Sequence, residues 1–101
     1  MARELVYGQA IMEALTEEMA RDSRVIFYGQ EQAVTDDDPL VRAFGRSRVR
    51  CTPISETAEI GMAIGAAMAG LRPVVELLMT DFILVAMNQV VNEAAPLRFK
   101  T

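Results

Sequence analysis

The strongest constraint on the fold of this chain is the alternation of short apolar segments with longer segments of helical periodicity. The apolar segments are expected to be strands, and they read "VIFYG", "RVRCT" and "PVVELLM", at 25–29, 48–52 and 73–79. Helices are expected at 4–21, 39–45 and 56–68, and a last one is expected to begin at Thr80 or Asp81 and to end at Pro96. Strands separated by helices imply βαβ crossovers and parallel pairing. We therefore expect an α/β fold of three layers, with one parallel sheet between flanking helices.

The expected sheet has few strands. Parallel sheets need cover on both faces and at their edges, so three strands resemble part of a larger unit. We expect residues 1–101 to form one domain that is truncated. Apolar surfaces made for absent segments would have to be covered, so we predict a homo-oligomer, either a dimer or a tetramer.

Composition and charge exclude several classes of function. The net charge is −4 and the 10 basic residues are scattered, whereas a nucleic-acid-binding protein normally gathers them on one face. No apolar run reaches the roughly 18 residues that a membrane-spanning helix needs, and the polar start is unlike a signal peptide. The single Cys51 suits a reducing compartment. We therefore expect a cytoplasmic protein that binds neither nucleic acid nor membrane.

The chain has no histidine, so it cannot assemble a Ser-His or Cys-His nucleophile pair by itself. It also lacks the cysteine, histidine and acidic spacings of zinc and calcium sites, and we expect no metal site made by this chain alone. The acidic run 36–38 has two interpretations. A metal site is one, but Pro39 follows directly, so a helix that begins with Asp38 as its N-cap is the preferred one.

The expected helix at 56–68 is rich in small residues. Gly61 and Gly65 lie four residues apart and so stand one above the other on the helix, with Ala69 a turn further on. A glycine inside a helix costs about 0.5–1 kcal/mol relative to alanine, so two of them need a compensating contact. A helix packed almost at backbone distance would provide it, either in the same domain or, as we favour, on another subunit. The side chains expected to face the sheet are Ile60, Ile64, Ala67 and Met68.

Two glutamates, Glu56 and Glu59, occupy the first turn of that helix. Acidic groups at this place stabilise a helix by roughly 0.3–1 kcal/mol through its dipole. A catalytic carboxylate is the other interpretation. The spacing alone favours the first.

The order of "TPISE", "IGAAMAGLRPVVE", "DF" and "NQVVNEAA" adds a second kind of information. It resembles the beta subunit of the thiamine-diphosphate-dependent 2-oxoacid dehydrogenases and of the related acetoin dehydrogenase. The similarity covers the start of the transketolase-like, pyrimidine-binding domain of that subunit. It extends from "YGQAIMEALTEEMARD" to "NEAAPLRF", which is nearly the whole chain.

The resemblance implies a role for three residues. Glu56 matches the glutamate that hydrogen-bonds the ring nitrogen N1′ of the cofactor's aminopyrimidine; sharing a proton there favours the imino form that takes the proton from C2 of the thiazolium. Phe82 matches a position whose ring lies against the pyrimidine, and Ile54 one that contacts the same ring. For Phe82, core packing is the other interpretation. The diphosphate and its Mg²⁺ would be held by a partner alpha subunit, through a Gly-Asp-Gly motif that this chain lacks.

Three departures from the family pattern stand beside the resemblance. The strand glycine is followed by "QEQ", with Gln30 where an acidic residue is usual and Glu31 next. The loop after it, "AVTDDDP", is short and lacks a glycine-rich piece. The chain ends at "LRFKT", before the histidine that the family places near the substrate.

Two hypotheses follow. In the first, the chain is the N-terminal part of such a beta subunit, which contributes Glu56 and is inactive alone. In the second, it is a non-catalytic, self-associating α/β module derived from that fold by truncation. A flavodoxin-like nucleotide-binding protein is disfavoured, since no strand is followed by a glycine-rich phosphate turn.

Overall fold

The computed structural model describes residues 2–30 and 35–100 of the chain. Three strands, β1 (Val25–Gln30), β2 (Val49–Thr52) and β3 (Arg72–Glu76), form one sheet in the order β2-β1-β3. Both pairings are parallel, with Phe27 opposite Val49 on one side and opposite Val74 on the other. The expected parallel sheet is therefore confirmed.

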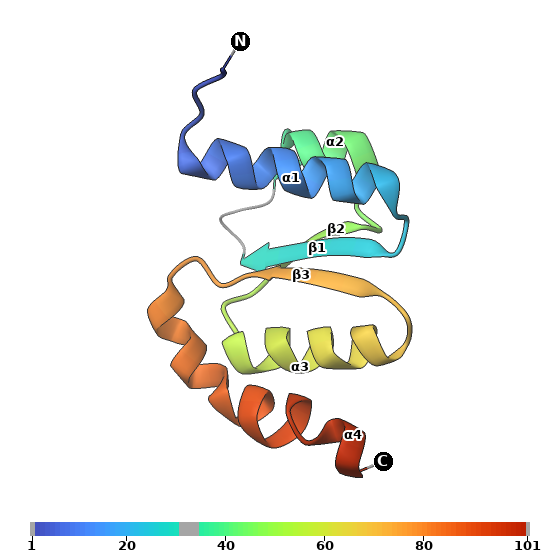
Figure 1. Cartoon of the computed structure of the whole chain (residues 1–101), viewed down its shortest axis with the longest axis vertical. Helices are drawn as coiled ribbons and strands as arrows, with labels where there is room; N and C mark the ends of the chain where they lie inside the picture. Colours follow the sequence, from blue (N-terminus) through green and yellow to red (C-terminus); the bar gives the residue numbers. More distant parts are fainter. Residues whose placement is uncertain (1, 31–34, 101) are drawn as a thin grey trace.

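Helices cover both faces of the sheet, which confirms the three-layer α/β fold (Figure 1). One face carries α1 (Tyr7–Arg21) and α2 (Pro39–Phe44), and the other carries α3 (Glu56–Met68). The segment after β3 consists of a 3₁₀-helix η1 (Thr80–Ala86), a π-helix η2 (Asn88–Ala94) and the short α4 (Leu97–Lys100). Both η1 and η2 pack against α3.

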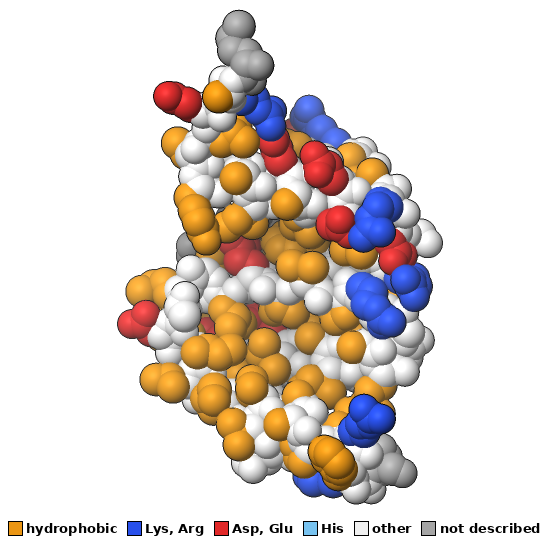
Figure 2. Space-filling model, in the orientation of Figure 1, with side chains coloured by type: hydrophobic (Ala, Val, Ile, Leu, Met, Phe, Trp, Pro, Cys, Tyr) orange, Lys and Arg blue, Asp and Glu red, His pale blue; other side chains and the backbone are white. Residues whose placement is uncertain are grey.

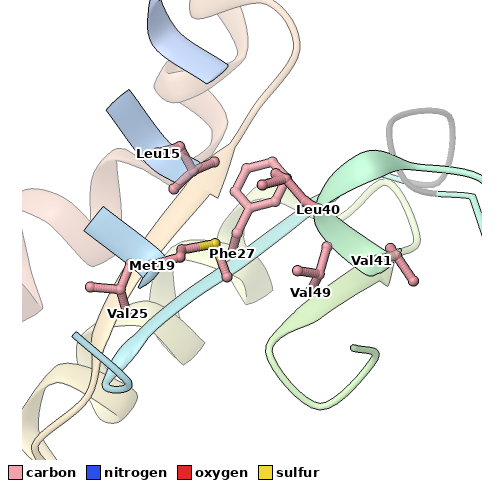
Figure 3. Close-up of a cluster of buried hydrophobic side chains, with 7 residues drawn as sticks. All are labelled: Leu15, Met19, Val25, Phe27, Leu40, Val41 and Val49. Carbon is pink, nitrogen blue, oxygen red and sulfur yellow. The ribbon is translucent and has the colours of Figure 1, made fainter. Parts of the chain in front are cut away.

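The hydrophobic core lies between the sheet and the α1–α2 layer (Figure 3). Val25 and Phe27 alternate along β1 and point to the same face. They meet Leu15 and Met19 from α1, and the cluster is completed by Leu40, Val41 and Val49. Only the second half of the expected α1 stripe takes part, because Tyr7 and Ile11 are 84% and 52% exposed.

Several ends of elements agree with the sequence and several do not. Asp38 caps α2, since its Oδ1 accepts a hydrogen bond of 2.7 Å from the Leu40 amide, and α3 has the expected bounds. In contrast, α1 begins three residues later than expected. The strand β3 ends at Glu76 rather than at residue 79, because Leu78 adopts a positive φ of 62° that no strand accommodates.

The last helix was expected to be a single one capped by Thr80 or Asp81, and this is wrong. No side chain caps η1, and the helical geometry changes between η1 and η2. Pro96 does not end the helical segment either. Its carbonyl accepts hydrogen bonds from the Phe99 and Lys100 amides, so a further turn follows it. A proline is tolerated there because the first turn of a helix needs no amide hydrogen from that position.

Candidate functional site

The carboxyl ends of the three parallel strands meet at one edge of the sheet. Gln30, Thr52 and Glu76 are the last residues of β1, β2 and β3. The connection from β1 to β2 runs through α2 on one face, and the connection from β2 to β3 runs through α3 on the other (Figure 1). Open α/β sheets bind ligands at such reversals, beside the carboxyl ends of the strands. This edge is therefore the candidate site.

Glu56 is the first residue of α3 and lies at this edge. Its side chain is buried, with a relative exposure of 8%. Its Oε1 accepts a hydrogen bond of 3.0 Å from Nε2 of Gln30 on β1. Glu56 is therefore buried and hydrogen-bonded to the sheet, in addition to lying in the first turn of α3, where its spacing alone favoured stabilisation through the helix dipole.

Glu59 lies one turn further along α3 and is fully buried, at 0% exposure. Its Oε1 accepts a hydrogen bond from the Thr52 hydroxyl, and its Oε2 lies 3.5 Å from Nε2 of Gln30. The Thr52 hydroxyl also lies 3.0 Å from the Gly29 carbonyl. The backbone carbonyl of Glu59 accepts a hydrogen bond of 2.7 Å from the Tyr28 hydroxyl. The first turn of α3 is thus tied to both β1 and β2.

Three residues of this network, Tyr28, Gln30 and Thr52, were not expected at the site from the sequence, and Glu59 was considered there only as the less favoured interpretation of its spacing. Two patterns could have indicated them. Tyr28 and Gln30 alternate on β1 and so share the face opposite the hydrophobic core. Glu56 and Glu59 are three residues apart on a helix, which puts both carboxylates on one side.

The electrostatic environment at this edge is negative. Burial raises the pKa of the Glu76 carboxyl, and the nearby Asp38 and Glu59 raise it further. Burial, with a smaller effect of Glu59, also raises the pKa of the Tyr28 hydroxyl. Among the described residues, Oε2 of Glu76 is a buried side-chain oxygen with no hydrogen-bond partner.

An open groove runs beside Glu56 between α3 and the segment that follows β3. Its floor includes Gly61 of α3, and its opposite side is formed by Val85 of η1 and Gln89 of η2. The Thr57 hydroxyl donates a hydrogen bond of 3.0 Å to the Val85 carbonyl, which fixes one end of the groove. The remaining lining residues are Ser55, Ala58 and Met62.

Ile54 and Phe82, the two other residues expected at the site, lie outside the lining of this groove. Ile54 is in the connection between β2 and α3 and is 69% exposed. Phe82 is in η1 and is 42% exposed, so core packing, its other interpretation, does not describe it. The structure therefore brings Glu56 together with Gln30 and Val85, and leaves Ile54 and Phe82 at the surface.

The two glycines of α3 differ in their surroundings. A Cβ at Gly61 would lie 3.1 Å from Oε1 of Gln89, so the neighbour that approaches Gly61 belongs to the same chain. A Cβ at Gly65 would meet nothing within 4 Å in the described parts of the chain. The expectation that Met68 and Ala67 face the sheet is wrong. Both are exposed, Met68 at 62%, whereas the buried residues of α3 are Glu56 and Glu59 in its first turn.

The acidic run 36–38 is occupied by protein partners. Asp36 pairs with Arg46, Asp37 pairs with Arg42 at 2.8 Å, and Asp38 caps α2. No group of three or more His, Cys, Asp or Glu side chains suited to a metal ion occurs within 2–30 and 35–100. The acidic run therefore forms ion pairs with arginines and caps the start of α2. Glu31, singled out beside Gln30, lies outside the described residues.

No helix in the described parts of the chain is both long and apolar enough to cross a membrane.

Comparison with known proteins points to one family. The family model described as the pyrimidine binding domain of transketolase matches residues 3–100. The 2-oxoisovalerate dehydrogenase subunit beta of Bacillus subtilis (strain 168) is 42% identical over 100 residues, which cover 94% of this chain and 31% of the relative. The acetoin:2,6-dichlorophenolindophenol oxidoreductase subunit beta of the same organism is 38% identical over 116 residues, covering 98% and 34%.

A third relative, the pyruvate dehydrogenase E1 component subunit beta of Gracilaria tenuistipitata var. liui, is 44% identical over 103 residues, covering 95% of this chain and 31% of the relative. The chain thus spans about a third of the length of the relatives it matches.

Proposed function

Because the chain belongs to the family of transketolase pyrimidine-binding domains, we propose that it supplies the aminopyrimidine-binding surface of a thiamine-diphosphate-dependent dehydrogenase. The relatives are named as beta subunits of 2-oxoisovalerate, pyruvate and acetoin-oxidising enzymes, which supports 2-oxoacids or acetoin as the substrate class. Residues 1–101 would then be the first part of such a subunit.

Glu56 is the residue that we propose to contact the cofactor. The supporting observation is its position: a nearly buried carboxyl group at the first turn of α3, held by Gln30 and bordering an open groove. A carboxyl group at such a place suits a ring nitrogen in the groove, because it can share a proton with that nitrogen. When bound, thiamine diphosphate supplies the carbanion and the electron sink of the reaction.

Ile54 and Phe82 remain proposed contacts of the same ring. Both are exposed and lie outside the groove at Glu56. Their exposure supports a cofactor that is sandwiched between this chain and another one, since an exposed apolar side chain gains from burial against a partner.

The diphosphate and its Mg²⁺ would be held by an alpha-type partner subunit. Magnesium is bound through carboxylates together with the phosphates of the ligand. The described residues offer no cluster of three such groups, and the one carboxylate that borders the groove already accepts from Gln30. We therefore propose that this chain contributes the pyrimidine side of the site and no metal ligand.

We propose that the chain alone does not decarboxylate 2-oxoacids. It contains no histidine, so it lacks the usual acid–base residue for the substrate. Assays of carbon dioxide release from pyruvate and from branched-chain 2-oxoacids should give the rate of the buffer blank. Steady release by the purified chain would refute this part of the proposal.

Calorimetric titration of the chain with thiamine diphosphate and Mg²⁺ tests the assignment of Glu56. Replacing Glu56 by Gln should weaken binding about tenfold or more, because a hydrogen bond to a charged group contributes roughly 1.5–3 kcal/mol. Glu17→Gln is the matched control, since Glu17 is exposed on α1 on the opposite side of the sheet. Equal affinities of the Glu56→Gln variant and the unaltered chain would refute the role of Glu56.

A second function is supported by a different observation. Large apolar side chains gather over η1 and η2 (Figure 2), where Leu84 is 74% and Val85 58% exposed. Exposed apolar patches of this kind mark protein–protein contacts. They support the alternative of a non-catalytic, self-associating module, as a dimer or tetramer. The relatives' names describe beta subunits and give no support for self-association, so the homo-oligomer stays a prediction.

Sedimentation equilibrium distinguishes the two functions. A self-associating module should form a dimer or tetramer, and Leu84→Glu should dissociate it, whereas the same change at the exposed Ile11 of α1 should not. Absence of any heat with thiamine diphosphate in the same preparation would favour the module. A monomer at high concentration would argue against it. A cytoplasmic location is part of either proposal, supported by the single Cys51, and is tested by cell fractionation.

A further inference from the structure

The side-chain amide of Gln30 lies between two buried carboxylates. Its Nε2 is 3.0 Å from Oε1 of Glu56 and 3.5 Å from Oε2 of Glu59. Gln30 itself is only 3% exposed. An ionised carboxylate only accepts hydrogen bonds, so the amide must present its NH₂ group to the pair. One amide group has two hydrogens, which is one for each carboxylate.

The two carboxylates need such a donor. They lie three residues apart on α3, at 8% and 0% exposure, and burying two carboxyl groups side by side costs free energy unless each is hydrogen-bonded. No lysine or arginine of the described residues forms an ion pair with either.

The groups that face the pair from the surrounding elements are few. From β1 they are Gln30 and the Tyr28 hydroxyl, which donates to the Glu59 carbonyl, and from β2 the Thr52 hydroxyl. From β3, the group is the carboxyl group of Glu76, which interacts electrostatically with Glu59. From η1 and η2 the groove presents Val85 and Gln89, which carry no charge. Gln30 is the one of these groups that donates to both carboxylates.

We propose that Gln30 is a positioning residue that holds Glu56 and Glu59 together as carboxylates and fixes the direction of the Glu56 side chain. With respect to the cofactor, the inference rests on the function proposed above. Gln30 engages Oε1 of Glu56, so Oε2 is the oxygen left for a ring nitrogen in the groove. A glutamate at position 30 would replace the donor by a third negative charge. One of the three carboxyl groups would then have to retain a proton.

Carbon-13 NMR titration of the glutamate side-chain carboxyl groups, in the chain without cofactor, tests the inference. Glu56→Gln and Glu59→Gln assign the two signals. In Gln30→Glu, the Glu56–Glu59 pair should titrate about one pH unit or more higher than in the unaltered chain, because a like charge replaces a donor. In Gln30→Met, which removes the donor without adding charge, the midpoints should rise by less.

Gln9→Glu is the matched control, since the same chemical change on the exposed surface of α1 should leave both signals unmoved. Unchanged midpoints in Gln30→Glu would overturn the inference. If that variant does not fold, Gln30→Met decides, and unchanged midpoints there overturn it equally.

A parallel titration with thiamine diphosphate and Mg²⁺ separates this inference from the proposed function. If the midpoints shift and Glu56→Gln binds the cofactor as tightly as the unaltered chain, the pairing by Gln30 stands and the proposed role of Glu56 fails. If the unaltered chain binds cofactor with the midpoints unmoved, the proposed function stands and the role of Gln30 fails. If both stand, Gln30→Met should weaken cofactor binding several-fold and shift its dependence on pH, which a loss of packing alone would not do.

Discussion

The two faces of the sheet are built from the same three strands but bury different chemistry. On the α1 side, seven buried side chains form a cluster of hydrocarbon and thioether groups. On the α3 side, the buried side chains include Gln30, Thr52, Glu56 and Glu59. Burying apolar surface stabilises a fold, whereas burying carboxylates costs free energy unless each is hydrogen-bonded. The α1 side is therefore the part that keeps the chain folded, and the α3 side is the part that carries polar chemistry.

Large apolar side chains are exposed on both sides of the sheet, and on the α1 side they include Tyr7 at 84% and Ile11 at 52% exposure. Around η1 and η2 the large apolar side chains point outward, including Met79 at 56%, Leu84 at 74% and Val91 at 52% exposure. The side chains that would have filled a core on this face are thus at the surface (Figure 2). On the α3 side, a buried polar network therefore lies beside an exposed apolar surface.

The largest expected effect tests whether stability resides on the α1 side. Leu40 is 2% exposed in the hydrophobic cluster, so Leu40→Ala should lower the free energy of unfolding by about 2–5 kcal/mol. Leu84→Ala removes the same atoms from the exposed surface and should change it by less than about 0.5 kcal/mol. Urea denaturation measures both. Similar losses in the two variants would mean that the faces do not differ as described.

The next effect concerns Arg48, which joins α1 to the sheet. Its guanidinium donates to the backbone carbonyls of Met19, Asp22 and Val25, at 2.7 Å, 3.0 Å and 2.9 Å, and stacks on Phe44. Arg48→Met should cost about 1.5–3 kcal/mol, because the carbonyls at the end of α1 and at the start of β1 lose a charged donor.

Arg50→Met is the control, since the Arg50 side chain makes one long bond of 3.4 Å to the Ser47 carbonyl. It should be nearly neutral in the same denaturation experiment. If Arg48→Met loses no more unfolding free energy than Arg50→Met, the contacts of Arg48 do not contribute to the stability of the α1 side.

The sequence predicts those features that depend on residues close together along the chain, and it does not predict those that depend on distant residues. The alternation of strands and helices, the Asp38 cap and the bounds of α3 follow from residues close in sequence, and all were predicted. The contacts of Gln30 connect residues 26 and 29 positions apart, which no local pattern specifies. Gln30 could be noticed as a departure from the family pattern, but not assigned its partners.

The error after β3 has a similar cause. The spacing of Leu84, Met87, Val91 and Ala94 is that of an α-helix. The chain forms η1 and η2 instead, both packed against α3, with the Thr57 hydroxyl bonded to the Val85 carbonyl. Tertiary contacts therefore override the local preference on the α3 side, where the interior is polar and small residues let the chain approach.

A smaller effect sharpens the description of α3. At Gly65 there is space for a Cβ, so Gly65→Ala should raise the free energy of unfolding by about 0.5–1 kcal/mol through better helix propensity. At Gly61 the added Cβ would displace the Gln89 side chain, so Gly61→Ala should gain less. Thermal denaturation compares them. An equal gain at both sites would show that the contact with η2 carries no weight, and weaker association of the Gly65→Ala variant would place a partner chain at Gly65.

The smallest effect is a pH dependence of stability that arises at Glu76, the last residue of β3. Because burial and the facing Asp38 and Glu59 raise the pKa of Glu76 above its value in the unfolded chain, the unfolded state releases this proton first as the pH rises. The contribution of Glu76 is complete at pH values below its unfolded pKa and is lost as the pH rises through the folded pKa.

The melting temperature of Glu76→Gln should therefore rise relative to that of the unaltered chain as the pH is raised from 4 upward. Asp22→Asn is the opposite control, because Arg24 lowers the pKa of Asp22 and its contribution is lost as the pH falls. The difference in melting temperature between Glu76→Gln and the unaltered chain could instead be constant with pH. The surroundings of Glu76 would then not disfavour its ionisation, and the negative charges on the α3 side would have no effect on the end of β3.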